Sequence, residues 1–308
     1  MILITGGAGF IGSHLADRLR KESEVRVLDN LSAGDQNVAY LRLKGIQIVR
    51  GDIRNAKTVH EAVKDVTVVF HLAAMNRAAR SIEHPLEANA VNIDGTLNVL
   101  DACRKEGCDF IFASSSSVYG GTGGKEDQAL CPLHPYGVGK LAGEHYARVY
   151  HQLYGVPSVI LRYVSVYGPR QRGDIDHAAV IPKFIGQVQN GKPVTVFGSG
   201  DQTRQFTYVE DTVEGTLLAW KKSRTGDAFN IASSEETSVN QILKGIEKMT
   251  GKKAYREVRP QPLADPNRNV IDVSKSKKRL GFSAATPFQE GLKKTFDWTV
   301  SQGTSERH

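Results

Sequence analysis

The sequence predicts an α/β protein with a doubly wound parallel sheet and a smaller, mostly C-terminal α/β lobe. Apolar runs of strand length alternate with helical patterns from residue 2 to residue 163. A glycine-rich turn joins the first strand directly to the first helix. Beyond Pro169 the alternation loosens into short segments rich in glycine and proline. Ligands bind outside the carboxyl ends of the strands in such sheets, so we expect the functional site there.

The composition is that of a soluble globular protein. Of 308 residues, 40% are hydrophobic and 24% are charged, which allows a large core. No apolar run reaches the roughly 18 residues of a membrane span, and residues 1–4 lead into glycines rather than a signal peptide, so we expect a cytoplasmic protein with no membrane contact. The formal net charge of +7 suits small anionic ligands, whereas the dispersed basic residues do not favour nucleic-acid binding.

The cysteines carry no sign of a disulfide or metal framework. Cys103, Cys108 and Cys131 form neither a C-x-x-C pair nor an even set. We therefore expect buried, reduced thiols and no bound metal.

The first strand, turn and helix form a dinucleotide-binding pattern. An apolar strand over residues 2–4 runs into glycines spaced G-x-x-G-x-x-G, and a helix follows with Leu15 and Leu19 on its core side. Such glycines allow a tight turn, a close approach of backbone to a pyrophosphate, and packing of the helix on the strand. The phosphates would lie at the helix N-terminus. The predicted cofactor residues here are Gly6, Gly9, Phe10, Ile11 and Gly12.

The second strand indicates which dinucleotide would bind. Residues 25–28 form this strand, and Asp29 follows it. A carboxylate at this position accepts hydrogen bonds from both ribose hydroxyls and repels a 2′-phosphate, so the pattern favours NAD over NADP. The alternative is that Asp29 is an ordinary turn residue before Asn30.

The next segments supply further candidate cofactor contacts. Strands are expected over residues 46–49 and 66–74, and a long helix over 89–103. Asp52 and Ile53 are placed to meet an adenine, and small residues at the end of the fourth strand would let a dinucleotide pass close to backbone. Each is equally explained by packing. The candidates are Asp52, Ile53, Leu72, Ala73, Ala74 and Asn92, together with Asn30.

A serine run and a Tyr-x-x-x-Lys pair form the candidate catalytic centre. A fifth strand over residues 110–113 delivers Ser114 to Ser117 to the ligand edge of the sheet. In a helix from residue 136, Tyr136 and Lys140 lie about one turn apart on one face. The cation favours ionisation of the phenol, which could then take a proton from an alcohol held by a serine. Alone, this spacing occurs often by chance and is usually that of a solvated helix face.

The rest of the chain completes the sheet and builds the lobe. Strands are expected over residues 158–163, 194–197 and 228–232, the last as a seventh strand of the first sheet, with helices over 209–220 and from 239. The predicted division is a dinucleotide-binding domain over 1–166, to which 206–236 return. Residues 167–205 and 237–308 form the lobe.

With these motifs, the chain resembles the extended short-chain dehydrogenase/reductase family, and within it the NAD-dependent nucleotide-sugar epimerases of the UDP-glucose 4-epimerase type. The likeness covers nearly the whole chain and implies a Rossmann sheet. Its carriers are residues 5–14 (TGGAGFIGSH), 51–54 (GDIR), 71–74 (HLAA), 92–96 (NIDGT), 114–120 (SSSSVYG), 136–140 (YGVGK), 161–163 (LRY), 202–209 (QTRQFTYV) and 229–231 (FNI).

The resemblance implies C4 epimerisation of a UDP-sugar through a transient 4-keto intermediate. Tyr136 would be the base, Lys140 would hold it ionised and bond the nicotinamide ribose, and Ser115 would be the catalytic serine. Ser116 would touch the substrate, and Ser114 and Tyr163 would contact the cofactor. The family commonly forms homodimers through helices that here span about 92–106 and 136–154.

Sibling enzymes of this family give the competing interpretations. The 4,6-dehydratases carry an Asp-Glu pair immediately before Val-Tyr-Gly, and decarboxylating relatives carry a Glu there. This chain has Ser116 and Ser117 at that place. Without an acid/base pair elimination is disfavoured. The alternatives are another nucleotide-sugar oxidoreductase or dehydratase of the family, or a non-catalytic NAD-binding regulatory protein.

Substrate anchoring is expected in the lobe. Arg204 matches the family arginine that clamps the diphosphate, a task suited to a guanidinium, and Arg268 would supply a second cation. The chain departs from the family at Ser165, where an asparagine usually helps to hold the diphosphate, and at Gln205, where an aspartate is common. Residues 261–267 also do not align cleanly with the family. The sequence therefore leaves the sugar and the base of the nucleotide open.

Overall fold

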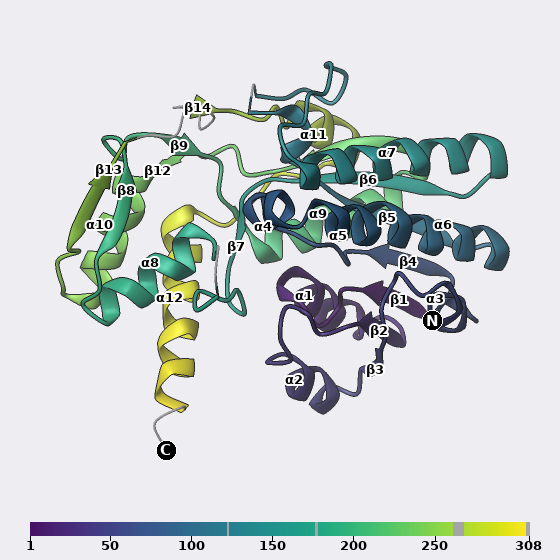
Figure 1. Cartoon of the computed structure of the whole chain (residues 1–308), viewed down its shortest axis with the longest axis horizontal. Helices are drawn as coiled ribbons and strands as arrows, with labels where there is room; N and C mark the ends of the chain where they lie inside the picture. The colour runs from purple at the N-terminus through teal and green to yellow at the C-terminus, as the bar shows by residue number, and fades with distance from the viewer. Residues whose placement is uncertain (122, 176–177, 261–267, 306–308) are drawn as a thin grey trace.

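A seven-stranded parallel sheet flanked by helices forms the larger part of the computed structural model, which describes residues 1–121, 123–175, 178–260 and 268–305 (Figure 1). The strand order is β11-β6-β5-β4-β1-β2-β3. These strands are β1 (Ile2–Thr5), β2 (Val25–Asp29), β3 (Gln47–Arg50), β4 (Val68–His71), β5 (Asp109–Ser115), β6 (Ser158–Tyr163) and β11 (Thr225–Ile231). The predicted doubly wound sheet, with its seventh strand, is confirmed.

The helices over the sheet are α1 (Phe10–Leu19), α2 (Val38–Leu43), α3 (Ala56–Val63), α4 (Ala78–Glu83), α5 (Pro85–Asn89), the π-helix η1 (Ala90–Asp94), α6 (Gly95–Glu106), the 3-10 helix η2 (Ser116–Tyr119), α7 (Pro135–Tyr154) and α9 (Val209–Lys222). The remaining elements are β7 (Val166–Tyr167), α8 (Val180–Gln189), β8 (Val194–Phe197), β9 (Thr203–Arg204), β10 (Thr207–Tyr208), β12 (Thr237–Ser238), α10 (Val239–Thr250), β13 (Arg256–Arg259), β14 (Arg268–Asn269), α11 (Ser274–Leu280) and α12 (Phe288–Ser305).

Alternation along the strands builds one apolar core on each face of the sheet. Ile4 of β1 belongs to the cluster under α1 and α9, whereas the preceding Leu3 belongs to the cluster under α3, α6 and α7. Phe70 and Val69 of β4 divide between the two faces in the same way. Successive strand residues point to opposite faces, so fully buried strands of this kind need helices on both sides.

The structure corrects two sequence-based boundaries near the ligand edge. Strand β4 ends at His71, so residues 72–74 lie beyond it. The helix expected over 89–103 is three segments, α5, η1 and α6, interrupted by a π-helix that contains Asn92. Single π-turns inside α-helices often occur at functional sites. Here the buried Asn92 amide bonds both backbone groups of Met75 and so holds the chain that leaves β4.

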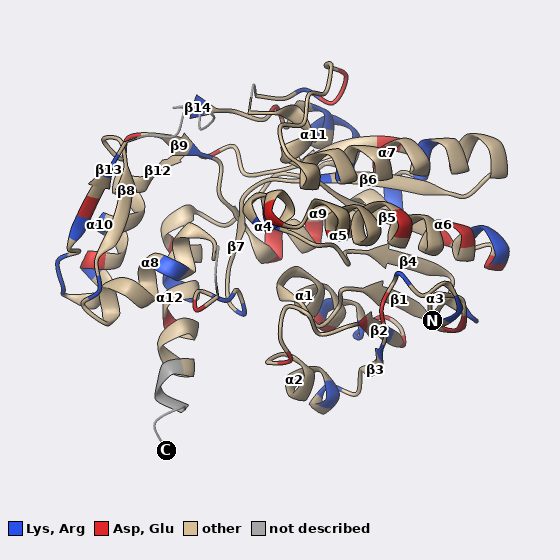
Figure 2. Ribbon diagram, viewed as in Figure 1, with Lys and Arg blue, Asp and Glu red and all other residues tan. Residues whose placement is uncertain are grey.

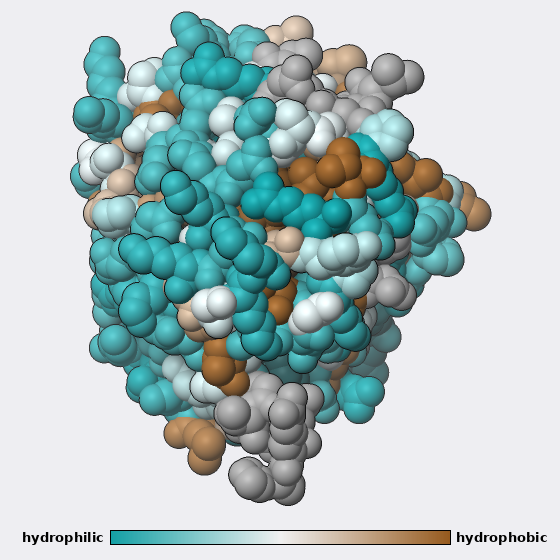
Figure 3. Space-filling view, turned by 90° about the vertical axis from the view of Figure 1, so that its left-hand side faces the viewer, coloured by the Kyte–Doolittle hydropathy of each residue, from teal (hydrophilic) through white to brown (hydrophobic). Residues whose placement is uncertain are grey.

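The smaller lobe has its own core on the left of Figure 1. Its cluster joins α8, β8, α10 and α12, and β8 pairs in parallel with β13. The outer face of this lobe is mostly hydrophilic, with small apolar patches (Figure 3). Helix α11, which the sequence assigned to the lobe, packs instead against α9 and β11 of the large sheet. The domain boundaries as a whole stay a prediction.

The distribution of charge agrees with the sequence-based expectation, whereas one of the three cysteines differs from it. Lys and Arg are interspersed with Asp and Glu along the ribbon (Figure 2). Cys103 and Cys108 are buried, but Cys131 is exposed because it lies in the loop that leads to α7. Among the described residues, every helix is too short or too polar to cross a membrane.

A buried ion pair ties α7 to the centre of the sheet. The Glu144 carboxylate on α7 accepts two hydrogen bonds from Arg162 on β6, at 2.8 and 2.7 Å, and one from Ser114 on β5, at 2.6 Å. Arg162 also donates to the Tyr119 hydroxyl, which donates to Asn230 on β11. Burial alone would raise the pKa of Glu144, but Arg162 outweighs burial and holds that pKa below its usual value. The resulting stabilisation is present at neutral pH and is lost as the pH falls through that lowered pKa.

Glu144→Gln should lower the free energy of unfolding by about 3 kcal/mol at pH 7, because it leaves the Arg162 guanidinium buried without its counter-charge. Urea unfolding followed by circular dichroism measures this. Glu87→Gln is the matched control, since its ion pair with Arg80 is long, at 3.7 Å, and solvent-exposed. It should change the free energy by less than about 0.5 kcal/mol. Equal shifts for both variants would show that the buried pair is not a main support.

Gly12→Ala should destabilise the protein by about 1–3 kcal/mol, because its Cβ would collide with the Gly6 carbonyl oxygen and lie 2.7 Å from Gly7 Cα, and backbone cannot move aside cheaply. Gly186→Ala on α8 is the control, since a Cβ there meets no atom within 4 Å. That variant should stabilise by up to about 1 kcal/mol. Thermal unfolding compares the two, and a Gly12 variant as stable as the Gly186 variant would contradict this packing.

Candidate active site

The glycine turn and the chain after β4 meet at the carboxyl ends of the strands. Gly6 has φ +70°, and a Cβ on it would lie 2.7 Å from the Ala73 backbone nitrogen. Leu72 donates from its backbone nitrogen to Thr5 at 3.0 Å, and Leu72, Ala73 and Ala74 are all partly exposed. The structure therefore brings these predicted residues beside the turn and leaves backbone there within reach of a ligand.

Helix α1 begins at this turn without a side-chain cap. Gly9 is its N-cap residue, so no side chain occupies the amide groups of the first turn. Uncapped N-terminal amides together with the helix dipole favour a bound phosphate. Phe10 and Ile11, the first two helical residues, also pack against the core of the smaller lobe. A phosphate at this end of α1 would thus lie close to the junction of the sheet and the lobe.

Asp29 and Asp52 present carboxylates along the same edge. Asp29 accepts from the Ala8 and Leu31 backbone nitrogens at 2.9 and 2.8 Å, and burial raises its pKa. Each carboxylate oxygen keeps accepting capacity, so ribose hydroxyls can still bond it. Arg54 holds the pKa of Asp52 well below its usual range, and Asn30 also donates to Asp52. These positions fit the ribose and adenine of a dinucleotide, with the buried Ile53 beside them.

Three predicted cofactor residues use their side-chain polar groups for hydrogen bonds within the protein. Ser114 donates to Glu144, the Asn92 amide bonds Met75, and the Tyr163 hydroxyl shares a hydrogen bond with Thr216 at 2.7 Å. All three side chains are buried. Their contribution to the site is therefore to hold β5, η1 and β6 in place, and their role in cofactor binding stays a prediction.

The start of α7 positions Tyr136 and Lys140. Pro135 occupies the first turn, and the His134 ring accepts from the Gly137 backbone nitrogen at 3.1 Å, which caps the helix. The buried Lys140 ammonium donates to the Ala113 carbonyl at 2.7 Å and lies 5.9 Å from the centre of the Tyr136 ring. The two residues do share one helix face. Burial lowers the pKa of Lys140 to about 7.

Lys140 does not control the phenol in the way that the spacing suggested. Burial raises the pKa of Tyr136, opposed by the Ser115 hydroxyl and the Arg77 guanidinium. The expectation of a pKa below the ordinary value in the protein alone is therefore wrong, because desolvation of the phenolate dominates. Ser115 is the last residue of β5 and the N-cap residue of η2. Its hydroxyl accepts a hydrogen bond from the Ser117 backbone nitrogen at 3.2 Å, and this bond fixes the hydroxyl near Tyr136. Ser116, partly exposed, begins η2.

The expected substrate residues gather on the lobe side. Arg204 on β9 is partly buried, and Arg268 on the neighbouring strand β14 forms a two-point ion pair with Glu236. The buried Gln205 side-chain amide forms hydrogen bonds with backbone groups of Ser233 and Ile271. Its polar atoms are therefore satisfied in place of the aspartate that is common at this position. Ser165 is exposed, with φ +39°. The third departure from the family, residues 261–267, lies outside the described residues.

Sequence reasoning missed two sets of residues. The network of Glu144 and Arg162 was detectable in part, because Glu144 follows Lys140 by four residues, as Lys140 follows Tyr136. Ser81 and Arg77 carried no local signal. Ser81 Oγ accepts from the Tyr136 backbone nitrogen at 3.0 Å, which docks α4 on the first turn of α7.

Comparison with known proteins agrees with this geometry. The profile of the NAD dependent epimerase/dehydratase family matches residues 2–232. The UDP-glucuronate 4-epimerase of Thermodesulfobacterium geofontis is 36% identical, over 96% of this chain and 95% of that protein. The crystal structure of a UDP-glucose 4-epimerase from Thermotoga maritima with UDP-glucose superposes with a TM-score of 0.91 at 33% identity, covering 98% and 99% of the two chains.

A third relative acts on a different sugar. The UDP-N-acetylglucosamine 4-epimerase of Methanobrevibacter ruminantium M1, in complex with UDP-N-acetylmuramic acid, has a TM-score of 0.92 at 32% identity and 98% coverage of each chain. The family description confirms NAD as the predicted cofactor, and the glycine turn, the uncapped α1 and Asp29 fit that dinucleotide. The chain belongs to the NAD dependent epimerase/dehydratase family, within the extended short-chain dehydrogenases/reductases, and is an enzyme of its UDP-sugar branch.

Proposed function

We propose that this protein catalyses C4 epimerisation of a UDP-sugar of the UDP-glucose/UDP-galactose type through a transient 4-keto intermediate. The observation that carries the proposal is that the Lys140 ammonium lies over the Tyr136 ring and bonds Ala113 of β5, with Ser115 of the same strand next to the phenol. The absence of a carboxylate at Ser116 and Ser117 supports epimerisation over elimination, because no acid/base pair stands there.

Each catalytic residue has a distinct task in this proposal. NAD, when bound, supplies the hydride acceptor and donor at its nicotinamide. Tyr136 takes the proton of the sugar 4-hydroxyl as the C4 hydrogen leaves, and it returns the proton when reduction occurs on the opposite face. Ser115 donates a hydrogen bond to the same sugar oxygen. Lys140, fixed by Ala113, places its positive charge beneath the Tyr136 ring.

The nucleotide would be anchored on the lobe while the sugar turns over. Arg204 is suited to clamp the diphosphate by bidentate contact, and Arg268 lies on the adjacent strand. The Glu236 carboxylate already pairs with Arg268, which makes Arg268 a weak candidate for phosphate contact. The relatives named above act on glucose, glucuronate and N-acetylglucosamine forms, so a UDP-sugar panel must include all three.

Two competing functions make different predictions in that panel. A dehydratase or simple oxidoreductase of the family would release water or consume NAD stoichiometrically. A non-catalytic NAD-binding regulator would turn over none of the sugars. Interconversion of C4 epimers without net consumption of NAD would support the epimerase alone.

Tyr136→Phe should reduce turnover by about 10²–10⁴, because it removes the group that moves the proton, while NAD remains bound. Product formation is followed by chromatography of the nucleotide sugars, and retained NAD by its release on denaturation. Tyr146→Phe, on the exposed side of the same helix, is the control and should be fully active. Full activity of the Tyr136 variant would exclude this mechanism.

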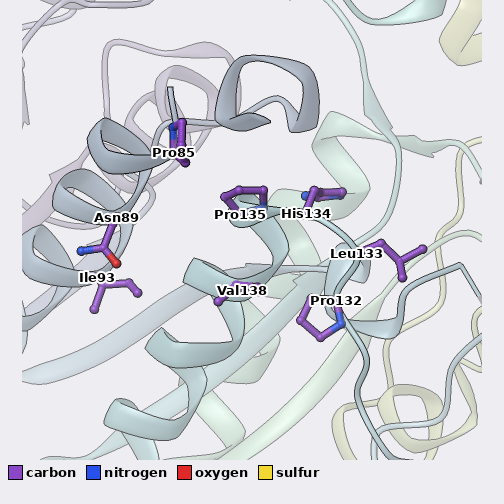
Figure 4. A pocket seen from close by; sticks show the side chains of 8 residues that line it. All are labelled: Pro85, Asn89, Ile93, Pro132, Leu133, His134, Pro135 and Val138. Atoms are coloured by element: carbon purple, nitrogen blue, oxygen red, sulfur yellow. The ribbon is translucent and has the colours of Figure 1, made fainter. Parts of the chain in front are cut away.

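We also propose that the protein is a homodimer formed through α6 and α7. Helix α7 packs on α6 and exposes large apolar side chains to solvent, which marks an interaction surface. These are Val138, Tyr146, Val149, Leu153 and Tyr154. A shallow cavity continues this surface at the start of α7, lined by Pro85, Ile93, Leu133 and Val138 among others (Figure 4).

The pair of changes Val149→Lys and Leu153→Glu should convert the dimer into a monomer, because charges would be placed in the apolar contact. Size-exclusion chromatography with light scattering gives the mass directly. Val258→Glu is the control, since Val258 is equally exposed, at 70%, but lies on the smaller lobe. A monomeric unaltered protein, or a variant that remains dimeric, would rule out this interface.

A further inference from the structure

The loop between β2 and α2, residues 30–37, is tied at both ends to the glycine turn. Asp29, just before the loop, accepts from the backbone nitrogens of Ala8 and Leu31 at 2.9 and 2.8 Å. At the far end, the buried Asn37 amide donates to the Ala8 carbonyl at 2.9 Å. A dinucleotide held by Asp29 and by the first amides of α1 would therefore lie against this loop.

The chain that follows β7, residues 168–174, is attached to α1 from the side of the smaller lobe. The Pro169 carbonyl and His14 Nε2 form a hydrogen bond of 2.9 Å. The Arg170 guanidinium donates through Nη1 to the Ser13 carbonyl at 3.3 Å. Both contacts fall on the first half of α1, next to the turn that would hold the phosphates of the cofactor.

This segment also has a fixed course between the two parts of the protein. A Cβ on Gly173 would lie 2.5 Å from the Pro182 carbonyl oxygen of α8, so glycine allows the chain to pass this close to that helix. Arg170 has φ +67°, a conformation that a residue with a Cβ adopts only when its surroundings require it. Figure 1 shows the chain after β7 passing between α8 and α1.

Arg172 joins this segment to the β2–α2 loop. Its Nη1 donates to the Ala33 carbonyl at 3.2 Å, and Nε and Nη2 donate to the Asp174 carboxylate at 3.0 and 2.6 Å. The neighbouring Gly34 has φ +103°, and a Cβ on it would lie 2.5 Å from Arg172 Nη1. Glycine at this position therefore suits both the turn and the close approach of the guanidinium.

Together these contacts form a closed ring around the first turn of α1. Its members are, in order, Ala8, Asn37, Ala33, Arg172, Arg170 and Ser13. The contact of Arg172 with Ala33 is the link between the two loops. Ala33 is exposed and Arg172 keeps 31% of its side chain exposed, whereas Asn37 is buried. A solvent-exposed hydrogen bond is weak, so the ring opens most easily at this link.

We propose that the contact between Arg172 and Ala33 is a latch over the NAD site, which opens when the cofactor exchanges and slows the release of bound NAD. Arg172 is a positioning residue for the β2–α2 loop and takes no part in moving a proton or a hydride. The inference rests on the NAD site of the family and not on the proposed function, so it applies whichever sugar is the substrate.

The primary test measures release of NAD from the holoenzyme. Protein loaded with radiolabelled NAD is mixed with excess unlabelled NAD, and the retained label is followed by rapid gel filtration. Arg172→Ala should release NAD about three- to tenfold faster, because it removes the donor to Ala33. Asp174→Asn leaves that donor in place but loosens the guanidinium, so it should give a smaller increase.

Arg26→Ala is the matched control for a general loosening of the fold. Arg26 also donates through Nη1 to a backbone carbonyl, that of Ala62, at 2.8 Å. It lies near the start of β2, at the opposite edge of the sheet from the ligand. This variant should release NAD at the unaltered rate, and thermal unfolding shows that each variant is folded.

The dissociation constant of NAD, measured by equilibrium dialysis, separates a latch from a direct phosphate contact. A latch lies across the path in both directions, so its removal should accelerate binding and release together and change Kd by less than about twofold. A guanidinium bonded to a phosphate would instead stabilise the bound state, and its loss would raise Kd by the same factor as the release rate.

The outcomes separate this inference from the proposed function. Unchanged release in Arg172→Ala overturns the latch, whatever the sugar panel shows. Faster release with an equal loss of affinity also overturns it, because Arg172 would then bind the cofactor itself. Equal acceleration in Arg26→Ala would do the same, by showing a general loosening. Faster release at unchanged affinity supports the latch even in a protein that turns over none of the sugars.

Discussion

The buried pair of Glu144 and Arg162 is the constraint on which the rest of the site depends. Neither side chain is exposed, and each remaining polar group around them finds a partner in Ser114, Tyr119 or Asn230. A buried pair of this kind is worth keeping only when its network is fully satisfied, because breaking one side leaves a charge in the core. The network joins α7 to β5, β6 and β11, so the helix cannot slide along the sheet without unpairing it.

This anchoring explains why a helix with two glycines in its first turns can hold the proposed catalytic group. Gly137 and Gly139 lower helix stability, but a Cβ on Gly139 would lie 2.8 Å from Asn92, so close packing with η1 requires glycine there. Tyr136, Lys140 and Glu144 follow one another at intervals of one turn. The last of them fixes the helix, the second bonds Ala113 of β5, and the first lies next to Ser115 at the end of that strand. Chemistry and anchoring thus share one helix face.

Local pattern was sufficient for the fold, and it also gave the candidate catalytic residues, whose roles stay a prediction. The alternation of strands and helices predicted the parallel sheet, and Tyr136, Lys140 and Ser115 were found from spacing and resemblance. The hydrogen-bond partners of the buried polar side chains could not be predicted, because those of Ser114, Asn92 and Tyr163 come from distant parts of the chain. The pKa of Tyr136 could not be predicted either, since it depends on how far packing excludes water from the phenol.

The absence of a carboxylate in η2 also bears on the type of reaction, because it changes the balance of charge around Tyr136. With Ser116 and Ser117 in place of acidic residues, η2 offers hydroxyls, and no carboxylate of η2 offsets the charge that Lys140 carries over the Tyr136 ring. An aspartate or glutamate in η2 would supply acid/base chemistry for elimination, and it would also neutralise the charge that favours a phenolate. Under the proposed function, the serines leave the site to move one proton and one hydride at a single carbon.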